Sequence, residues 1–161
     1  MDETEVRKVT DRLRRLCSRR EYCSSDILKK AVTALEGDKE IAEKVLAELI
    51  KDKYVDDFRY ASAYAREKAM ISGWGETKIR YMLSGKRVAS DIIAQALNEI
   101  DEGKASTRLE KIIENKYRSL KSDPQCRLKL LRFALGRGYK YDDVVPVVNV
   151  LLDARVVDQN E

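Results

Sequence analysis

The amino-acid sequence predicts an all-α protein, built as an elongated, curved array of three tandem three-helix repeats. Apolar residues recur every three or four positions along most of the 161-residue chain, and few runs alternate as a strand would. Leu35, Leu83 and Leu135 each close a short apolar stretch at similar intervals along the chain. Hydrophobic residues make up 43% of the chain and charged residues 37%, which suits helices with a core and much surface.

The interval between similar positions is 48 residues and then 52 residues. Ten residues after the three leucines come Val45, Ile93 and Val145, and fourteen residues after them come Leu49, Leu97 and Asn149. Asn149 breaks the pattern, and Val148 or Val150 is expected to replace it. A three-helix unit of this length buries little surface alone, so stacked units are favoured. The predicted repeats span residues 1–53, 54–102 and 103–161.

The first repeat is predicted to contain helices near residues 3–20, 26–35 and 38–50. Ser24 or Ser25 is the expected N-cap of the second helix, because a serine side chain can accept a bond from a free N–H of the first turn. Gly37 is expected to end that helix.

The second repeat is predicted to contain helices near residues 57–71, 76–83 and 90–100, and the third near 104–120, 123–135 and 142–152. Pro124 is expected in the first turn of its helix, where the missing N–H costs little. Pro146 is expected close to the first turn of the last helix.

Residues 54–83 carry the most distinctive pattern in the chain. Asp56 and Asp57 precede an apolar run, in which Phe58, Ala61, Ala65 and Ala69 recur at helical spacing. Such carboxylates suit the start of a helix, where N–H groups are unpaired and the dipole is positive. A Gly73-Trp74-Gly75 turn follows, and then a short helix with Ile79, Met82 and Leu83 on one face.

This stretch resembles the RecX family of bacterial regulatory proteins. The matching motifs are an acidic pair, a helix start, a glycine turn and a short helix: Asp56-Asp57, Phe58, Gly73-x-Gly75 and Ile79-Arg80-x-x-Leu83. The family usually continues with Lys-Gly and an apolar residue, whereas this chain has Lys86-Arg87-Val88.

The resemblance implies the three-repeat array and a function without catalysis. It implies that the protein binds filaments of the RecA recombinase on DNA and inhibits recombinase and ATPase activity. The result would be to temper recombinational DNA repair and the SOS response.

Two basic segments flank an acidic centre. Residues 7–20 hold seven basic side chains and one acid, and residues 104–140 hold eleven basic side chains and three acids. The candidate contact residues are Arg12, Arg15 and Arg19 in the first segment and Arg127, Lys129 and Arg132 in the second. Exposed cationic faces attract phosphates or acidic partners, although a merely solvated helix face has the same pattern.

Three aromatic residues are further candidates for an interface. Trp74 is either a contact residue of its turn or packs between neighbouring helices, and packing is the favoured interpretation. Tyr60 and Tyr64 lie one helical turn apart and could stack on a base, but such tyrosines more often join a core to its rim.

The sequence gives little support to an enzyme. It has no histidine and no phosphate-binding loop, so we expect no catalytic, cofactor or metal residues. Capping is favoured over metal binding for Asp56-Asp57. The odd cysteine count, with no zinc spacing, and the lack of a signal peptide or membrane span predict a soluble, cytoplasmic protein. We also expect a monomer.

Two alternatives from other classes remain open. One is a protein that binds single- or double-stranded DNA directly, and the other is a helical adaptor whose basic faces are only solvated. Residues 90–101 argue against a DNA-recognition helix, because they are acidic where base-reading side chains are needed.

Overall fold

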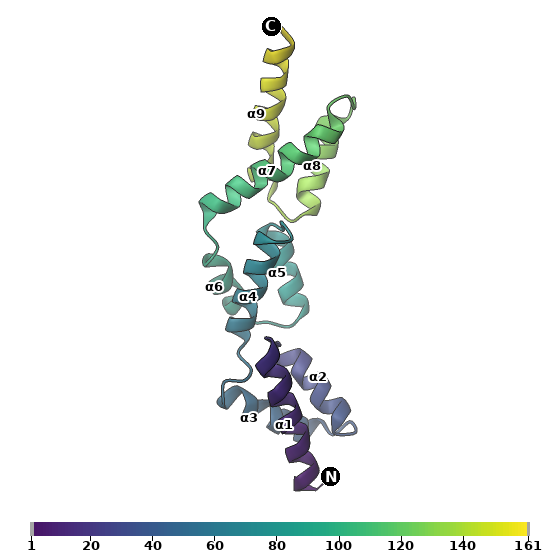
Figure 1. Ribbon diagram of the computed structural model, residues 1–161, viewed down its shortest axis with the longest axis vertical. Helices are drawn as coiled ribbons and strands as arrows, with labels where there is room; N and C mark the ends of the chain where they lie inside the picture. The colour runs from purple at the N-terminus through teal and green to yellow at the C-terminus, as the bar shows by residue number, and fades with distance from the viewer. Residues whose placement is uncertain (1, 161) are drawn as a thin grey trace. The chain divides into compact units, whose positions relative to one another are not determined.

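The computed structural model describes the backbone of residues 2–160 and the side chains of residues 2–154. Those residues form nine α-helices and no strand, so the all-α prediction is confirmed (Figure 1). The helices are α1 (Glu3–Arg19), α2 (Ser24–Ala34), α3 (Lys39–Lys51), α4 (Asp57–Met70), α5 (Glu76–Gly85), α6 (Ser90–Asn98), α7 (Glu102–Leu120), α8 (Cys126–Gly136) and α9 (Tyr141–Asn160).

The chain divides into two compact units. The first runs up to Tyr64 and also includes Leu83–Ala96. The second comprises Ala65–Met82 and the chain from Leu97 onward. The boundaries of the three predicted repeats stay a prediction.

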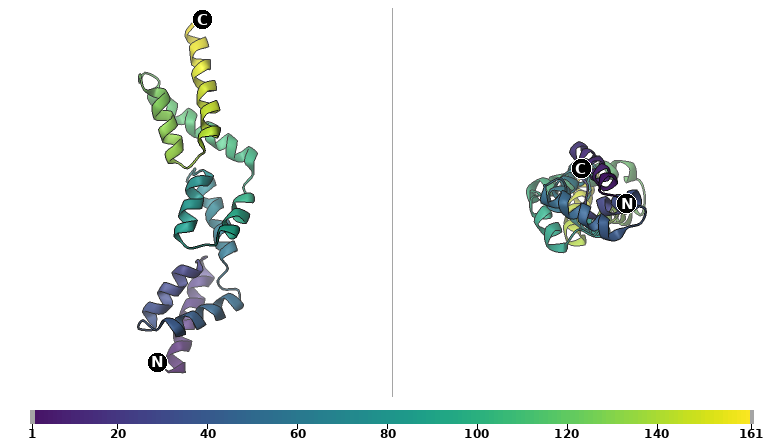
Figure 2. Two further views of the ribbon diagram at one scale, coloured as in Figure 1. Left: turned by 180° about the vertical axis from the view of Figure 1, so that it is seen from behind. Right: turned by 90° about the horizontal axis from the view of Figure 1, so that it is seen from below.

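The core of the first unit lies among α1, α2 and α3. These three helices pack against one another, as seen from opposite sides in Figures 1 and 2. Ile27, Leu35 and Leu49 are its largest fully buried side chains. Val9, Leu13 and Cys17 are spaced four residues apart and form the buried stripe of α1.

The core of the second unit lies among α7, α8 and α9, which also pack against one another (Figure 1). Ile113 of α7, Leu130 of α8 and Val144 and Val148 of α9 are fully buried in it. Cys126 is buried in this core, and Cys17 and Cys23 are buried in the first unit. None of the three forms a disulfide within the described residues.

The predicted equivalence of Leu135 with Leu35 and Leu83 is wrong. Leu35 and Leu83 are fully buried, whereas Leu135 is 40% exposed and its neighbour Ala134 is buried. An offset of 51 residues from the second set, instead of 52, restores the match. Its three buried positions are Ala134, Val144 and Val148. The helix turns by about 100° per residue, so a shift of one position moves a side chain from the core to the surface. Val148, not Val150, therefore replaces Asn149 in the pattern.

Aspartate side chains begin several helices. Asp2, Asp38, Asp56 and Asp101 each accept a hydrogen bond from the backbone N–H three residues later, at 2.9 to 3.1 Å. Each bond satisfies one of the N–H groups that the first turn of a helix leaves free. Helix α7 therefore begins at Glu102, two residues before the predicted start.

The predicted N-cap of α2 is wrong. The cap position is Cys23, whose side chain makes no capping bond, and Ser24 and Ser25 lie in the first turn. The Ser25 hydroxyl donates instead to the carbonyl oxygen of Lys86 at 2.6 Å. The capping oxygen comes from another part of the chain, as described below.

The predicted place of Pro124 is also wrong. It precedes α8, which begins at Cys126 after a turn in which Asp123 accepts from the Gln125 N–H at 2.8 Å. Pro146 lies inside α9 as its sixth residue, so one backbone bond of the helix is missing there. The ring is exposed, which leaves the unpaired carbonyl group one turn earlier within reach of water.

Candidate functional site

The paired carboxylates at the start of α4 serve two different helices. Asp56 Oδ1 accepts from the Arg59 N–H of its own helix at 3.0 Å. Asp57 Oδ1 accepts from the Ser24 N–H, at the start of α2, at 2.7 Å. Phe58, next in the sequence, is 36% exposed and lies at the edge of the apolar run. The acidic pair therefore acts as two helix caps, the favoured sequence interpretation.

The Gly73-Trp74-Gly75 turn is held by the end of α8. Gly73 has a φ of +70°, a conformation that disfavours any side chain. Its carbonyl oxygen accepts from the Tyr139 hydroxyl at 3.1 Å. The Gly75 N–H donates to the carbonyl oxygen of Arg137 at 2.8 Å. These bonds join two segments that are far apart in the sequence within the second unit.

Position 75 requires glycine because another backbone segment lies close to it, not because of its φ angle. A Cβ atom there would lie 2.5 Å from the carbonyl carbon of Gly138. Gly138 in turn has a φ of +96°, and a Cβ atom on it would lie 2.4 Å from the Cβ of Lys78. Only glycine at both positions lets the two backbones approach so closely.

Trp74 is half-buried and lies close to two lysines. The ammonium groups of Lys68 on α4 and Lys78 on α5 lie 4.9 Å and 4.4 Å from the centre of its ring. Cations in such positions are attracted to the face of an indole. Trp74 thus joins the two helices on either side of its turn and places two positive charges beside it.

Tyr60 and Tyr64 form a tilted pair on α4, with ring centres 5.9 Å apart. Both are half-buried. Burial raises the pKa of Tyr60 to about 12, helped by the nearby Cys23 and Asp26. Tyr60 therefore belongs to the rim of the core. Because both rings are half-buried and lie beside each other, neither presents a fully open face for stacking.

The short helix α5 carries the remaining motif residues. Ile79 and Leu83 are fully buried, whereas Met82 is 40% exposed and does not share their environment. Arg80 pairs with Glu76 at 2.8 Å, one turn earlier on the helix. The hydrogen bond from Arg80 and the charge of Lys140 lower the pKa of Glu76 against the effect of burial.

The segment after α5 forms a tight turn around Arg87. Arg87 has a φ of +61°, the left-handed conformation that glycine adopts more readily. The Val88 N–H donates to the carbonyl oxygen of Leu83 at 3.2 Å, and the Val88 side chain is buried. Arginine therefore occupies the position where the family usually has glycine.

Lys86 connects this turn to α2. Its Nζ atom lies 3.0 Å from Asp26 Oδ2. Burial of Asp26 opposes its charge, but the hydrogen bond and charge of Lys86 outweigh it and lower the pKa of Asp26. The sequence offered no local signal for this pair, which is separated by 60 positions.

Arg12, Arg15 and Arg19 all lie exposed on α1. Their spacing places them on one side of the helix, well away from the buried stripe. In the described part of the chain, the structure pairs none of the three with a carboxylate. They therefore form a cationic surface, which we call the α1 basic face.

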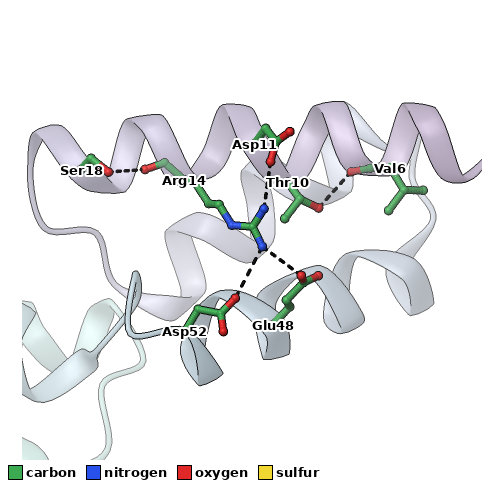
Figure 3. Close-up of polar contacts among 7 residues, drawn as sticks. All are labelled: Val6, Thr10, Asp11, Arg14, Ser18, Glu48 and Asp52. Atoms are coloured by element: carbon green, nitrogen blue, oxygen red, sulfur yellow. Dashed lines mark hydrogen bonds and ion pairs between the residues drawn. The ribbon is translucent and has the colours of Figure 1, made fainter.

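Arg14 lies between these arginines in the sequence but has a different role (Figure 3). Its guanidinium contacts Asp11 at 2.8 Å, Glu48 at 2.9 Å and Asp52 at 3.5 Å. Figure 3 shows it pointing from α1 toward Glu48 of α3 and Asp52 at the end of that helix. Arg14 thus fastens α1 to α3, and its charge is unavailable to a partner.

Arg127, Lys129 and Arg132 of α8 do not form a similar face. Arg127 donates to Asn149 Oδ1 on α9 at 3.3 Å. Lys129 pairs with Asp123, and mainly this hydrogen bond lowers the pKa of Asp123. Arg132 is exposed. Arg127 lies on a different side of α8 from Lys129 and Arg132, and two of the three have partners within the chain.

The described residues contain no group of three or more His, Cys, Asp and Glu side chains placed to hold a metal ion. Along the same residues, no helix has both the length and the apolar character needed to cross a lipid bilayer.

These features define a helical protein with an exposed basic face and a glycine turn that is hydrogen-bonded to the segment after α8. Residues 56–97, which contain α4, α5 and all but the last residue of α6, match the family description "RecX, second three-helix domain". The chain is 34% identical over 147 residues to the regulatory protein RecX of Clostridium tetani, covering 81% of this chain and 67% of the relative. It is 33% identical over 132 residues to the regulatory protein RecX of Vibrio parahaemolyticus, covering 80% and 82%.

Solved structures agree on the fold. The crystal structure of a regulatory protein RecX superposes with a TM-score of 0.81 at 21% identity, covering 90% of this chain and 72% of that one. The crystal structure of RecX from Lactobacillus salivarius gives 0.78 at 18% identity, covering 92% and 97%. The chain belongs to the RecX family of regulatory proteins.

Proposed function

We propose that this protein binds filaments of the RecA recombinase on DNA and inhibits the recombinase and ATPase activity of those filaments. Membership of the RecX family supports the choice of partner, since the relatives are named regulatory proteins. In a bacterial cell such an inhibitor tempers recombinational repair and the SOS response. We place its action in the cytoplasm, where the recombinase works.

The α1 basic face is the observation that carries this proposal. A filament of protein on DNA presents phosphates and acidic side chains, and an exposed cationic face is attracted to both. Arg12, Arg15 and Arg19 make no ion pairs within the described residues, so their full charge is available. Binding elsewhere on the chain at the same time would add avidity.

The test is co-sedimentation with recombinase filaments on single-stranded DNA, set beside binding to naked single-stranded DNA at the same salt concentration. We expect the wild-type chain to pellet with filaments and to slow their ATP hydrolysis. Pelleting with naked DNA to the same extent would favour the direct DNA-binding alternative. An absence of binding to either would leave the adaptor alternative.

Charge-reversed variants locate the contact. Arg12→Glu, Arg15→Glu and Arg19→Glu together should weaken filament binding and reduce its dependence on salt, because fewer counterions are released. The matched control reverses Lys29, Lys39 and Lys51, which are also exposed. Arg132→Glu tests the one exposed candidate of α8 without an observed partner. Equal loss in the α1 variant and the control would remove the α1 basic face from the proposal.

A further inference from the structure

A cleft of about 500 Å³ lies within the second unit. One wall is a face of α7, which contributes Arg108, Lys111 and Ile112. The rest of the lining comes from residues 70–73, at the end of α4 and the start of the glycine turn. Phe133 of α8 and Arg137, just after that helix, complete it.

The cleft is lined by cations. Arg108, Lys111, Lys116 and Arg137 all contribute to it, and no carboxylate side chain of the described residues lines it. The helical turn of about 100° per residue places Glu110 and Glu114 of α7 away from this wall. The uncompensated charge favours an acidic occupant.

One guanidinium in the cleft has an unused donor. The Arg108 Nε atom is buried from water and has no acceptor in the structure. A buried N–H without a partner is unfavourable, so an anionic oxygen supplied from outside would bind well there. Arg137 is already engaged, because its Nη1 atom donates to the carbonyl oxygen of Ser72 at 2.8 Å.

The rim of the cleft is strongly apolar. Ile71 is 82% exposed and Met70 is 66% exposed, although large aliphatic side chains normally avoid water to this extent. Adjacent apolar residues left in water beside a cleft mark a contact site for another molecule. An occupant therefore needs an apolar group as well as negative charge.

These features fit a protein segment better than single-stranded DNA. Proteins that bind single strands stack bases on open aromatic faces. Phe133 is the aromatic side chain lining this cleft, and Lys116 and Arg137 already lie 5.1 Å and 5.2 Å from the centre of its ring. Aliphatic rim residues offer bases no comparable surface, but they suit a leucine or similar side chain.

We propose that this cleft binds an acidic protein segment that carries an aliphatic side chain. Carboxylates of the segment contact Arg108 and Lys111, and its aliphatic group packs on Ile71 and Met70. The inference deepens the proposed function and rests on it for the partner, since the segment would belong to the recombinase protein rather than to its DNA.

The first test uses a fluorescein-labelled peptide of alternating acidic residues and leucines, with an oligo-dT strand as the second probe. Lys111→Glu should weaken peptide binding at least tenfold, and Ile71→Ser at least threefold. Lys104→Glu is the matched control, because Lys104 is exposed on the same helix but does not line the cleft. It should change peptide affinity less than twofold. Both lysine variants should lower the affinity for oligo-dT to the same modest degree.

Several outcomes overturn the proposal. These are no measurable peptide binding by the wild-type chain, equal peptide affinity of the Lys111 and Lys104 variants, or a loss confined to oligo-dT with Lys111→Glu. Circular dichroism of each variant shows whether the helices are kept. Filament pelleting by the wild-type chain is measured separately. If pelleting fails while the peptide results hold, the cleft still binds an acidic segment, but the assignment of that segment to the recombinase fails together with the proposed function.

Discussion

Asp57 on α4 accepts a hydrogen bond from the backbone N–H of Ser24 at the start of α2, across 33 positions of sequence. The bond places a carboxylate at the positive end of the α2 dipole, where the helix lacks a side-chain cap of its own. Asp56, its neighbour, caps α4 locally. Two adjacent aspartates thus begin two helices, and one of them ties distant segments of the first unit together.

Removing the Asp57 carboxylate should therefore destabilise the protein. We expect Asp57→Ala to lower the free energy of unfolding by about 1–2 kcal/mol, since a lost cap costs about that much. Asp57→Asn keeps an acceptor oxygen and should cost less. Urea denaturation followed by circular dichroism measures both. Asp56→Ala is the comparison, and it should cost less than Asp57→Ala because Asp56 is exposed while Asp57 is half-buried. The reverse order would argue against the long-range cap.

Replacing Arg87 by glycine should stabilise the protein. Arg87 holds a φ of +61°, which costs a residue with a Cβ about 1–2 kcal/mol relative to glycine. The added freedom of glycine in the unfolded chain offsets about 0.4–1 kcal/mol of that gain. The net expectation for Arg87→Gly is a higher urea midpoint. Ser84→Gly, three residues earlier inside α5, should instead lower the urea midpoint, because glycine is less favourable than serine inside a helix. A loss of stability in both variants would show that Arg87 makes contacts worth more than its strain.

Adding one methyl group at Gly75 should be costly. Its Cβ would lie 2.5 Å from backbone atoms of Gly138, which cannot move aside as a side chain can. We expect Gly75→Ala to lower the free energy of unfolding by about 2–3 kcal/mol, in the range of overpacked interiors. Gly85→Ala provides the control, because nothing lies within 4 Å of its added Cβ and Gly85 is helical. That variant should be neutral or slightly stabilising. Similar thermal unfolding temperatures for the two variants would contradict the close contact of Gly75 with Gly138.

Tyr60 should make stability depend on alkaline pH. Its pKa is about 12 in the folded protein, against an ordinary 10, because burial disfavours the phenolate. A raised pKa in the folded state gives a contribution that is complete below pH 10 and is lost as the pH rises from 10 toward 12. The urea midpoint of the wild-type chain should therefore fall more steeply across this range than that of Tyr60→Phe. Absorbance near 295 nm should show one fewer late-titrating tyrosine in the variant. If the absorbance difference between the wild-type chain and the variant is centred at pH 10 instead, Tyr60 is solvated.

Much of the fold follows from patterns that are local in the sequence. Apolar residues at helical spacing identify the helices, because each α-helical turn brings residues three and four apart to one face. Aspartates mark many of the helix starts, because a capping carboxylate reaches only a few residues along the chain. The Gly73-Trp74-Gly75 pattern predicts a turn that needs an unusual backbone at one of its two glycines, and Gly73 has a φ of +70°. The family motif in residues 54–83 could also be identified from the sequence alone.

Other features were decided by the tertiary structure, because they depend on which distant residues meet. The sequence could not distinguish Arg14, which is held by Glu48 and Asp52, from the exposed Arg15 beside it. Nor could it tell Asp57 from Asp56, since only packing brings Ser24 to one of them. The cleft lined by Arg108 and Arg137 requires α7 and α8 to meet the turn at Gly73. Spacing along a helix sets which side chains share a face, but the partner of each charge is chosen by the three-dimensional approach of separate segments.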